Sequence, residues 1–176
     1  MLQFFEMYLL KKDILILPIG LLLCIATLCL ESCSSHKAMS VLDDVESYIQ
    51  ERPDSALQIL NKLDRESLNA NKLRAKFSLL YSAALNKNYI DTTDLSIIQP
   101  AVDFYSKHGN PVEKMKAYFY QGCFQSNRGE DDRAMLSYQL ALEDSSKVSD
   151  DHYKELVNSA ISDIFSRNYN VEQELA

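Results

Sequence analysis

Between positions 41 and 167, the apolar residues recur every three to four positions, and this spacing most constrains the fold. The clearest stripe places Val41, Leu42, Val45, Tyr48 and Ile49 on one face of a helix. No segment alternates between apolar and polar residues over enough positions to favour a strand. Only 4 Gly and 4 Pro occur in 176 residues, which leaves few sites for tight turns. The sequence therefore predicts an all-α fold.

Polar breaks and prolines divide this region into seven predicted helices. Pro53 disfavours a helical conformation at the residue before it, so the first helix ends there and the second begins at Asp54 or Ser55. Pro100 predicts a helix start near Gln99, or a kink. The remaining helices are expected at Leu73–Leu85, Asp94–Lys107, Val112–Ser126, Asp131–Val148 and Asp151–Arg167.

The fifth and sixth predicted helices form one unit of 34 residues, Met115–Val148. Within it, small residues stand where the two helices would cross at close range, at Gly122 and Ala134. Tyr118 and Tyr138 would fill the gaps beside them. We expect Gly122 and Ala134 to face each other.

This unit resembles the tetratricopeptide repeat (TPR), a helix–turn–helix unit of the same length. The matching positions are Tyr118, Gly122, Gly129, Ala134, Tyr138 and Ala141. Two positions depart from the pattern: Gln125 replaces an aromatic residue and Ser146 replaces proline. The resemblance implies antiparallel helix pairs stacked as a TPR-like α-solenoid. Val41–Leu63 resembles a shortened repeat, and the last repeat is incomplete because Asn170–Ala176 is too short for a packed helix.

The N-terminal segment carries the features of a secretory signal. Lys11 and Lys12 precede an uncharged run of 17 residues, Ile14–Leu30. At about 1.5 Å per residue this run alone falls short of the roughly 30 Å hydrocarbon core of a bilayer. The following letters, LESC, resemble a bacterial lipobox with Cys33 as the lipidated residue, although Glu31 is unusual there. An uncleaved membrane anchor and a buried helix are the alternatives.

We therefore expect three parts: a lipoprotein signal peptide or membrane anchor at 1–32, a tether at 33–40, and a TPR-like helical domain at 41–176. From Cys33 onward the chain resembles bacterial TPR lipoproteins, through the runs PDSALQILNKLD, NYIDTTD, IIQPAVDFYSKHGN and AYFYQGCFQSNRGEDDRAMLSYQLALE. The resemblance implies a protein lipid-anchored to a bacterial membrane in the cell envelope, with its body in the periplasm. Longer members continue to a membrane span and a DNA-binding or signalling module, so a sensor part of such a regulator is an alternative.

Composition and motifs argue against several classes of function. The net charge is −7 and no window holds a dense Lys/Arg cluster, so this stretch is not expected to bind nucleic acid. No phosphate-binding loop, nucleophile elbow or zinc-protease motif occurs, and the three His are scattered. Of the 4 Cys, only Cys123 falls in the predicted body, which excludes an internal disulfide there. We expect no catalytic activity, cofactor or metal site.

The resemblance also implies a binding surface, because the first helix of each repeat lines the concave wall of a TPR stack. The wall positions of this sequence are Lys116, Phe119, Tyr120, Cys123, Ser126, Asn127, Ser159, Asp163 and Arg167. Some related repeats clamp a carboxylate with Lys and Asn there, but Phe119 and Cys123 replace the polar groups that such a clamp needs. We expect a mildly apolar strip that takes an extended segment or helix of a protein or peptide partner.

Two alternatives accompany this expectation. Phe119 and Tyr120 are large enough to belong to the core instead of the wall. A helical scaffold of a glycan-binding outer-membrane lipoprotein is a different functional class, but such proteins are far longer and use exposed aromatic platforms. The absence of Trp from this chain argues against it.

Lipidation at Cys33 gives a direct test of the N-terminal interpretation. The full-length protein should take up labelled fatty acid, because the Lys-Lys pair, the apolar run and LESC stand in the order of a lipoprotein signal. Cys33→Ala should abolish the label and leave precursor. Label retained in Cys33→Ala would reject the assignment.

Overall fold

A computed structural model describes residues 35–149 and 151–174. These residues are helical or lie in short connections, and no strand occurs among them, so the chain is all-α as predicted. Cys33 and the apolar run before it lie outside the described residues. Within the described part, none of the helices combines the length and the hydropathy that a membrane span requires.

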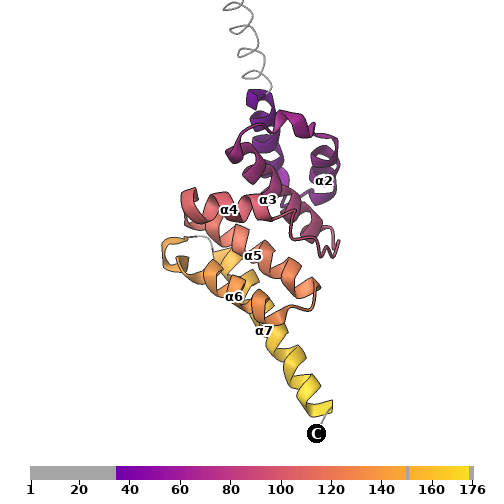
Figure 1. The fold of residues 1–176 in the computed structure, drawn as a ribbon, viewed down its shortest axis with the longest axis vertical. Helices are drawn as coiled ribbons and strands as arrows, with labels where there is room; N and C mark the ends of the chain where they lie inside the picture. Colours follow the sequence, from indigo (N-terminus) through magenta and orange to yellow (C-terminus); the bar gives the residue numbers. More distant parts are fainter. Residues whose placement is uncertain (1–34, 150, 175–176) are drawn as a thin grey trace, which may run out of the picture.

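The helices follow one another with short connections (Figure 1). Residues 35–48 form the first described helix. It is followed by α2 (Pro53–Lys62), α3 (Asn71–Lys87), α4 (Gln99–His108), α5 (Pro111–Asn127), α6 (Asp131–Leu142) and α7 (Asp151–Glu174). Two single 3₁₀ turns, η1 (Arg65–Ser67) and η2 (Ser145–Lys147), lie in the connections before α3 and α7.

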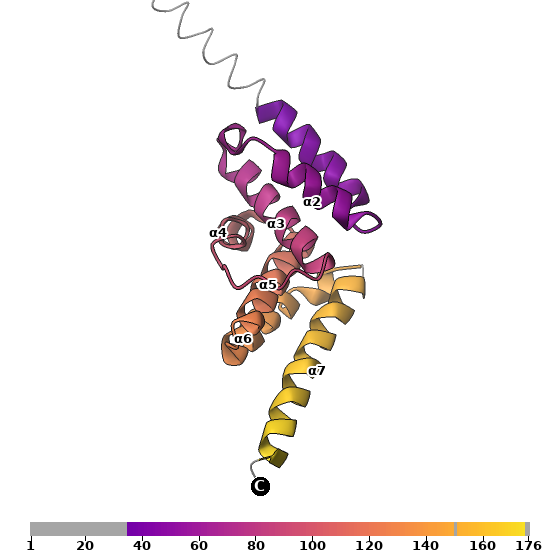
Figure 2. The same ribbon diagram turned by 90° about the vertical axis from the view of Figure 1, so that its right-hand side faces the viewer.

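The helices form an elongated stack with the 35–48 helix at one end and α7 at the other (Figures 1 and 2). From α2 onward each helix contacts the next one in the chain, and α5 also contacts both α3 and α7. Helices α3, α5 and α7 therefore share one side of the stack.

Local sequence explains where several helices begin. Asn110 and Glu113 form a capping box at α5: the Asn110 side chain accepts from the Glu113 N–H at 3.0 Å, and the Glu113 carboxylate accepts from the Asn110 N–H at 2.8 Å. Pro111 follows at the first helical position, where its missing N–H costs nothing. The expected start at Gln99 is confirmed for α4, with Pro100 in its first turn.

Several boundaries differ from the sequence predictions, among them the start of the helix expected at Asp94–Lys107, which begins at Gln99. Residues 35–40, expected as part of the tether, are helical, because Ala38 continues the apolar stripe and is buried. The helix predicted to reach Val148 ends at Leu142, where η2 and a polar connection follow. Conversely, α7 runs on to Glu174 instead of stopping at Arg167, since no Gly or Pro interrupts it.

Lys76 joins the 35–48 helix to α3. Its ammonium lies 2.5 Å from Asp43 and 2.6 Å from Glu46, and only 17% of its side chain is exposed. Burial alone lowers the pKa of this lysine, but the two carboxylates outweigh that effect and raise the pKa above its ordinary value. These two ion pairs thus connect the 35–48 helix to α3.

In the hairpin of α5 and α6, a side chain of α6 lies directly against Gly122 of α5. A Cβ atom on Gly122 would lie 2.3 Å from Cε1 of Tyr138, so the ring occupies the space that a side chain would need. The three atoms nearest to that position all belong to Tyr138, which was expected to fill the gap beside the small residues of this crossing. Gly129 forms the turn between the helices with φ +75°, a conformation that glycine adopts without strain.

The polar departure from the repeat pattern also has a structural explanation. Gln125 is buried on α5, at the position where the resemblance called for an aromatic residue. Its carbonyl oxygen accepts a hydrogen bond of 2.6 Å from the hydroxyl of Ser137, which is buried on α6. A satisfied polar pair therefore replaces an aromatic contact between the two helices.

Replacing Gly122 tests this packing. We expect Gly122→Leu to lower the free energy of unfolding by about 1–3 kcal/mol or more, because the new side chain would need the space that the buried Tyr138 ring occupies. Urea denaturation measures the effect. Gln139→Leu, at an exposed position of α6, serves as the control and should change the stability by less than about 0.5 kcal/mol. An unfolding curve for Gly122→Leu that matches the parent would contradict the packing described here.

Candidate functional site

Seven of the nine residues predicted for the wall line a single groove. We call it the inner groove; its cavity measures about 260 Å³ and lies mainly between α5 and α7. Its lining consists of Asn86, Phe119, Cys123, Ser126, Asn127, Tyr138, Leu156, Ser159, Ala160, Asp163 and Arg167. Sequence reasoning missed Asn86, Tyr138, Leu156 and Ala160 as groove residues. Of these, Ala160 is adjacent to the predicted Ser159, and Leu156 lies one helical turn before it. Helical spacing could therefore have predicted both of them as groove residues.

One edge of the inner groove is polar and bears a paired cation. The guanidinium of Arg167 donates to the Ser126 hydroxyl at 2.8 Å and to the Asp131 carboxylate at 3.0 Å. These bonds tie α7 to the end of α5 and the start of α6. Because Asp131 neutralises Arg167 and Asp163 adds a carboxylate to the lining, the groove presents no excess positive charge.

The floor of the inner groove is apolar and tightly packed. Phe119 is only 4% exposed and Tyr138 only 2%, with their ring centroids 6.2 Å apart. The Tyr138 hydroxyl donates to the Cys123 sulfur at 3.8 Å. Burial raises the pKa of the Tyr138 hydroxyl above its ordinary value, and it raises the pKa of the Cys123 thiol to about 12. Both groups therefore stay protonated at neutral pH.

The expectation that Phe119 and Tyr120 form part of an exposed wall needs correction. Both side chains are buried, Tyr120 at 1% exposure, and they contact each other with ring centroids 5.0 Å apart. On α5 these neighbours point toward the core formed with α6 and α7, because the helix is covered on more than one side. Phe119 reaches the inner groove only as part of its floor.

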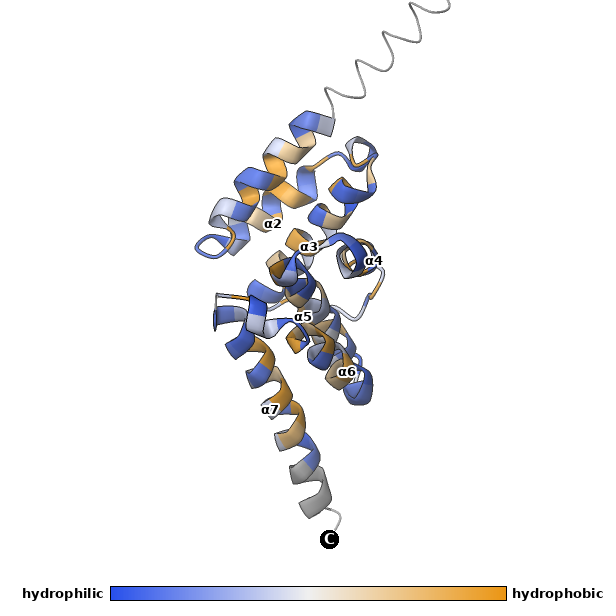
Figure 3. Cartoon of the chain, turned by 90° about the vertical axis from the view of Figure 1, so that its left-hand side faces the viewer, coloured by the Kyte–Doolittle hydropathy of each residue, from blue (hydrophilic) through white to orange (hydrophobic). Residues whose placement is uncertain are grey.

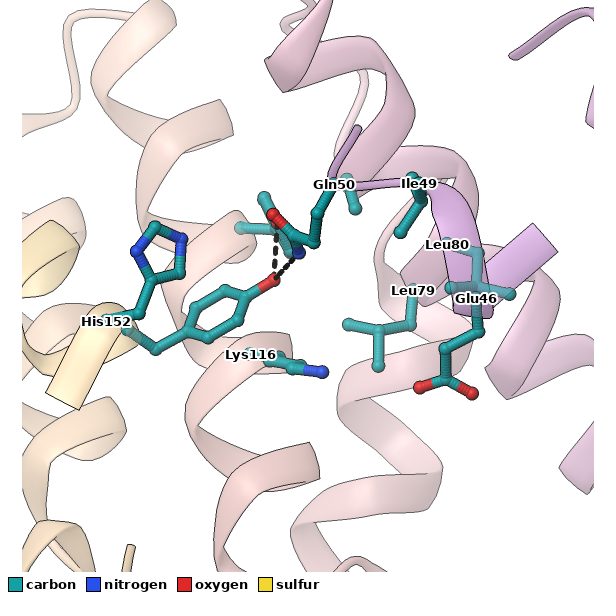
Figure 4. Close-up of a pocket in the computed structure, with 10 residues that line it drawn as sticks. Glu46, Ile49, Gln50, Leu79, Leu80, Lys116 and His152 are labelled. Carbon is teal, nitrogen blue, oxygen red and sulfur yellow. Dashed lines mark hydrogen bonds between the residues drawn. The ribbon is translucent and has the colours of Figure 1, made fainter. Parts of the chain in front are cut away.

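Lys116 and Tyr120 line a second cavity of about 430 Å³ farther along the same side of the stack (Figure 4). We call it the upper pocket. It is lined by residues of the 35–48 helix, of the turn that follows this helix, and of α3, α5 and α7. The lining consists of Glu46, Ile49, Gln50, Leu79, Leu80, Ala83, Lys116, Tyr120, His152 and Tyr153. The predicted wall is therefore divided between two cavities.

Tyr153 organises the upper pocket. Its hydroxyl accepts from the Gln50 side chain at 3.4 Å and lies 3.2 Å from the hydroxyl of Tyr120 (Figure 4). The ammonium of Lys116 lies 5.1 Å from the centre of the Tyr153 ring, within cation–π range. Burial and the neighbouring Tyr153 raise the pKa of Tyr120 well above its ordinary value. Tyr153 was not among the predicted wall residues, although it begins the apolar stripe of α7.

The stripe on α7 explains how this helix reaches both cavities. Tyr153, Val157 and Ile164 are buried at helical spacing, and hydrophobic residues recur along the helix between polar turns (Figure 3). Ser159 and Asp163 lie beside that stripe, one helical turn apart, and both are exposed. The helix therefore packs with one face and presents polar groups along the groove with an adjacent face.

Among residues 35–149 and 151–174, no group of three His, Cys, Asp or Glu is arranged to hold a metal ion. A protonated, largely buried thiol at Cys123 is a poor nucleophile. Comparison of the chain with protein-family models, with curated proteins and with solved structures gives no significant match.

The state of Cys123 can be measured by alkylation. Iodoacetamide at pH 8 should modify Cys123 slowly in the folded protein and rapidly in urea, because the reactive species is the thiolate. Since the folded pKa of about 12 exceeds the ordinary value of 9.0, the stability linked to this thiol is present below pH 9 and is lost as the pH rises toward 12. Peptide mapping separates Cys123 from the other cysteines. Equal modification rates in both states would show that the thiol is accessible and ionised.

Proposed function

We propose that the chain is a non-catalytic binding module whose TPR-like helix pairs stack as an α-solenoid and whose inner groove holds an extended segment of a protein partner. The contacts that α5 makes with α3 and α7 support the solenoid, because in such a stack alternate helices line one side. The α5–α6 hairpin, with its turn at Gly129 and the close approach at Gly122, supports the repeat.

The single observation that carries the proposal is the convergence of the wall positions. Residues about 40 positions apart, such as Phe119 on α5 and Ser159 on α7, line one groove. Its edge offers hydroxyl, amide and carboxylate groups, and its floor offers apolar surface. This combination suits the backbone of an extended segment and one or two of its apolar side chains.

The charges in the groove narrow the class of partner. Arg167 is already paired with Asp131, so it provides no strong site for the C-terminal carboxylate of a peptide. Asp163 is exposed in the lining. A neutral or mildly basic internal segment therefore fits better than an acidic peptide end.

A lipid anchor at Cys33 is compatible with this arrangement. Lipidation at Cys33 would hold the protein to a membrane of the cell envelope through the end of the stack that carries the 35–48 helix. The inner groove is lined mainly by α5 and α7. Figure 1 shows α7 at the opposite end of the stack from the 35–48 helix. The groove would then project into the periplasm, where a soluble or membrane-bound protein partner can reach it.

A crosslinking experiment tests the groove. A photoreactive amino acid placed at Ser159, which is exposed in the groove, should form covalent adducts with a partner in intact cells. The control position is Asn158, which is also exposed on α7 but does not line the groove. We expect adducts at position 159 and few or none at position 158.

A blocking variant complements this result. Ser159→Tyr should fill part of the groove and abolish adducts from a second probe at Asp163, while Asn158→Tyr should leave them unchanged. Thermal unfolding of both variants should match the parent, because both positions are exposed. Adducts of equal yield at positions 158 and 159, or adducts that survive Ser159→Tyr, would reject the inner groove as the binding surface.

A further inference from the structure

A second concave surface lies on the other side of α3, where this helix packs beside α4. Two cavities of about 360 and 410 Å³ adjoin there, since Arg74 and Pro100 line both. We call this surface the outer trough; the residues that matter for its chemistry are Arg65, Arg74, Phe77, Tyr81, Pro100 and Lys107. Helices α3 and α4 contact each other there, and Figure 2 shows α4 nearly end-on beside α3.

The outer trough is separate from the inner groove and the upper pocket. Arg74, Phe77 and Tyr81 point from α3 into the trough, whereas the α3 residues of the other two cavities are 79, 80, 83 and 86. At 3.6 residues per turn these two sets occupy different faces of the helix. A ligand in the trough therefore need not compete with one in the groove.

An aromatic floor holds one cation of the trough in place. Phe77 and Tyr81 are stacked with ring centroids 5.4 Å apart. The guanidinium carbon of Arg65 lies 3.9 Å from the Phe77 centroid and 5.2 Å from that of Tyr81. A guanidinium stacked in this way keeps its N–H edges available for a planar acceptor such as a carboxylate. Arg65 forms no ion pair within the described part of the chain.

The trough is positively charged in a chain that is acidic as a whole. Three cations line it, Arg65, Arg74 and Lys107, against one carboxylate, Asp103, while the chain carries a net charge of −7. Arg74 donates to the Leu68 carbonyl at 3.0 Å and to the Asn71 side chain at 2.6 Å, both neutral partners. Arg65 and Arg74 are thus positioned by the fold without being neutralised by a carboxylate.

We propose that the outer trough binds an acidic polypeptide segment that carries an aromatic or large aliphatic side chain. Carboxylates of the segment would pair with Arg65, Arg74 and Lys107, and the apolar side chain would lie beside Arg65 against the exposed parts of Tyr81 and Ile97. Charge complementarity selects the acidic segment. The apolar floor favours a polypeptide over a simple anion, and the overall negative charge of the chain repels long polyanions such as nucleic acid.

Fluorescence anisotropy with the full-length chain in detergent tests the proposal. The probes are two short labelled peptides of equal length: one combines Asp and Glu with a central Phe, and the other has Lys in place of the acidic residues. We expect the acidic peptide to bind and the basic one not to bind. Arg65→Gln and Lys107→Gln should each weaken binding about three- to fivefold. Arg65→Lys, which keeps the charge, should retain most of the affinity.

A control variant distinguishes binding in the outer trough from a general effect of the protein's charge. Arg133→Gln removes one positive charge from α6, where the side chain is 70% exposed and outside the trough, and should leave the affinity unchanged. Equal weakening by Arg133→Gln and Arg65→Gln would overturn the proposal. Unchanged affinity in Arg65→Gln would also overturn it, as would displacement of the peptide by inorganic phosphate at a similar concentration. The inner-groove variant Ser159→Tyr should not affect this binding, so the test is independent of the proposed function.

Discussion

The contact between Gly122 and the ring of Tyr138 is the constraint on which the second half of the structure depends. The absence of a side chain at Gly122 lets α6 approach α5 closely enough for the Tyr138 ring to occupy that space. The same ring then contacts Phe119 and donates its hydroxyl to Cys123. One small residue thus determines the spacing of the hairpin and the shape of the floor of the inner groove.

The aromatic contacts extend from this hairpin to the rest of the stack. Phe119 lies 6.1 Å from the Tyr153 ring of α7, and the Tyr153 hydroxyl bonds to Tyr120 and to Gln50 beyond the first helix. A buried tyrosine hydroxyl needs a hydrogen-bond partner, and the hydroxyls of Tyr120 and Tyr153 provide one for each other. The outcome is a core that fixes α7 against α5, which is the geometry that the groove requires.

Charge is distributed differently on the two sides of α3. Toward the inner side, Lys76 is neutralised by Asp43 and Glu46, and farther along Arg167 is neutralised by Asp131. In the outer trough, Arg65 is held by aromatic stacking and Arg74 by neutral oxygens. Paired charges position helices, whereas cations that are held without a carboxylate keep their capacity to bind an anion.

Helical periodicity and the small residues at 122 and 129 were sufficient to predict an all-α chain and the α5–α6 hairpin, because both are local features of the sequence. The resemblance to the tetratricopeptide repeat, and not periodicity alone, singled out residues such as Cys123 and Ser159, which line the inner groove. Only the tertiary structure decided that Phe119 and Tyr120 are buried, because burial depends on the helices that pack against α5 from elsewhere in the chain. The same holds for Tyr153 and for the outer trough: their neighbours are distant in sequence, so no local pattern encodes their contacts.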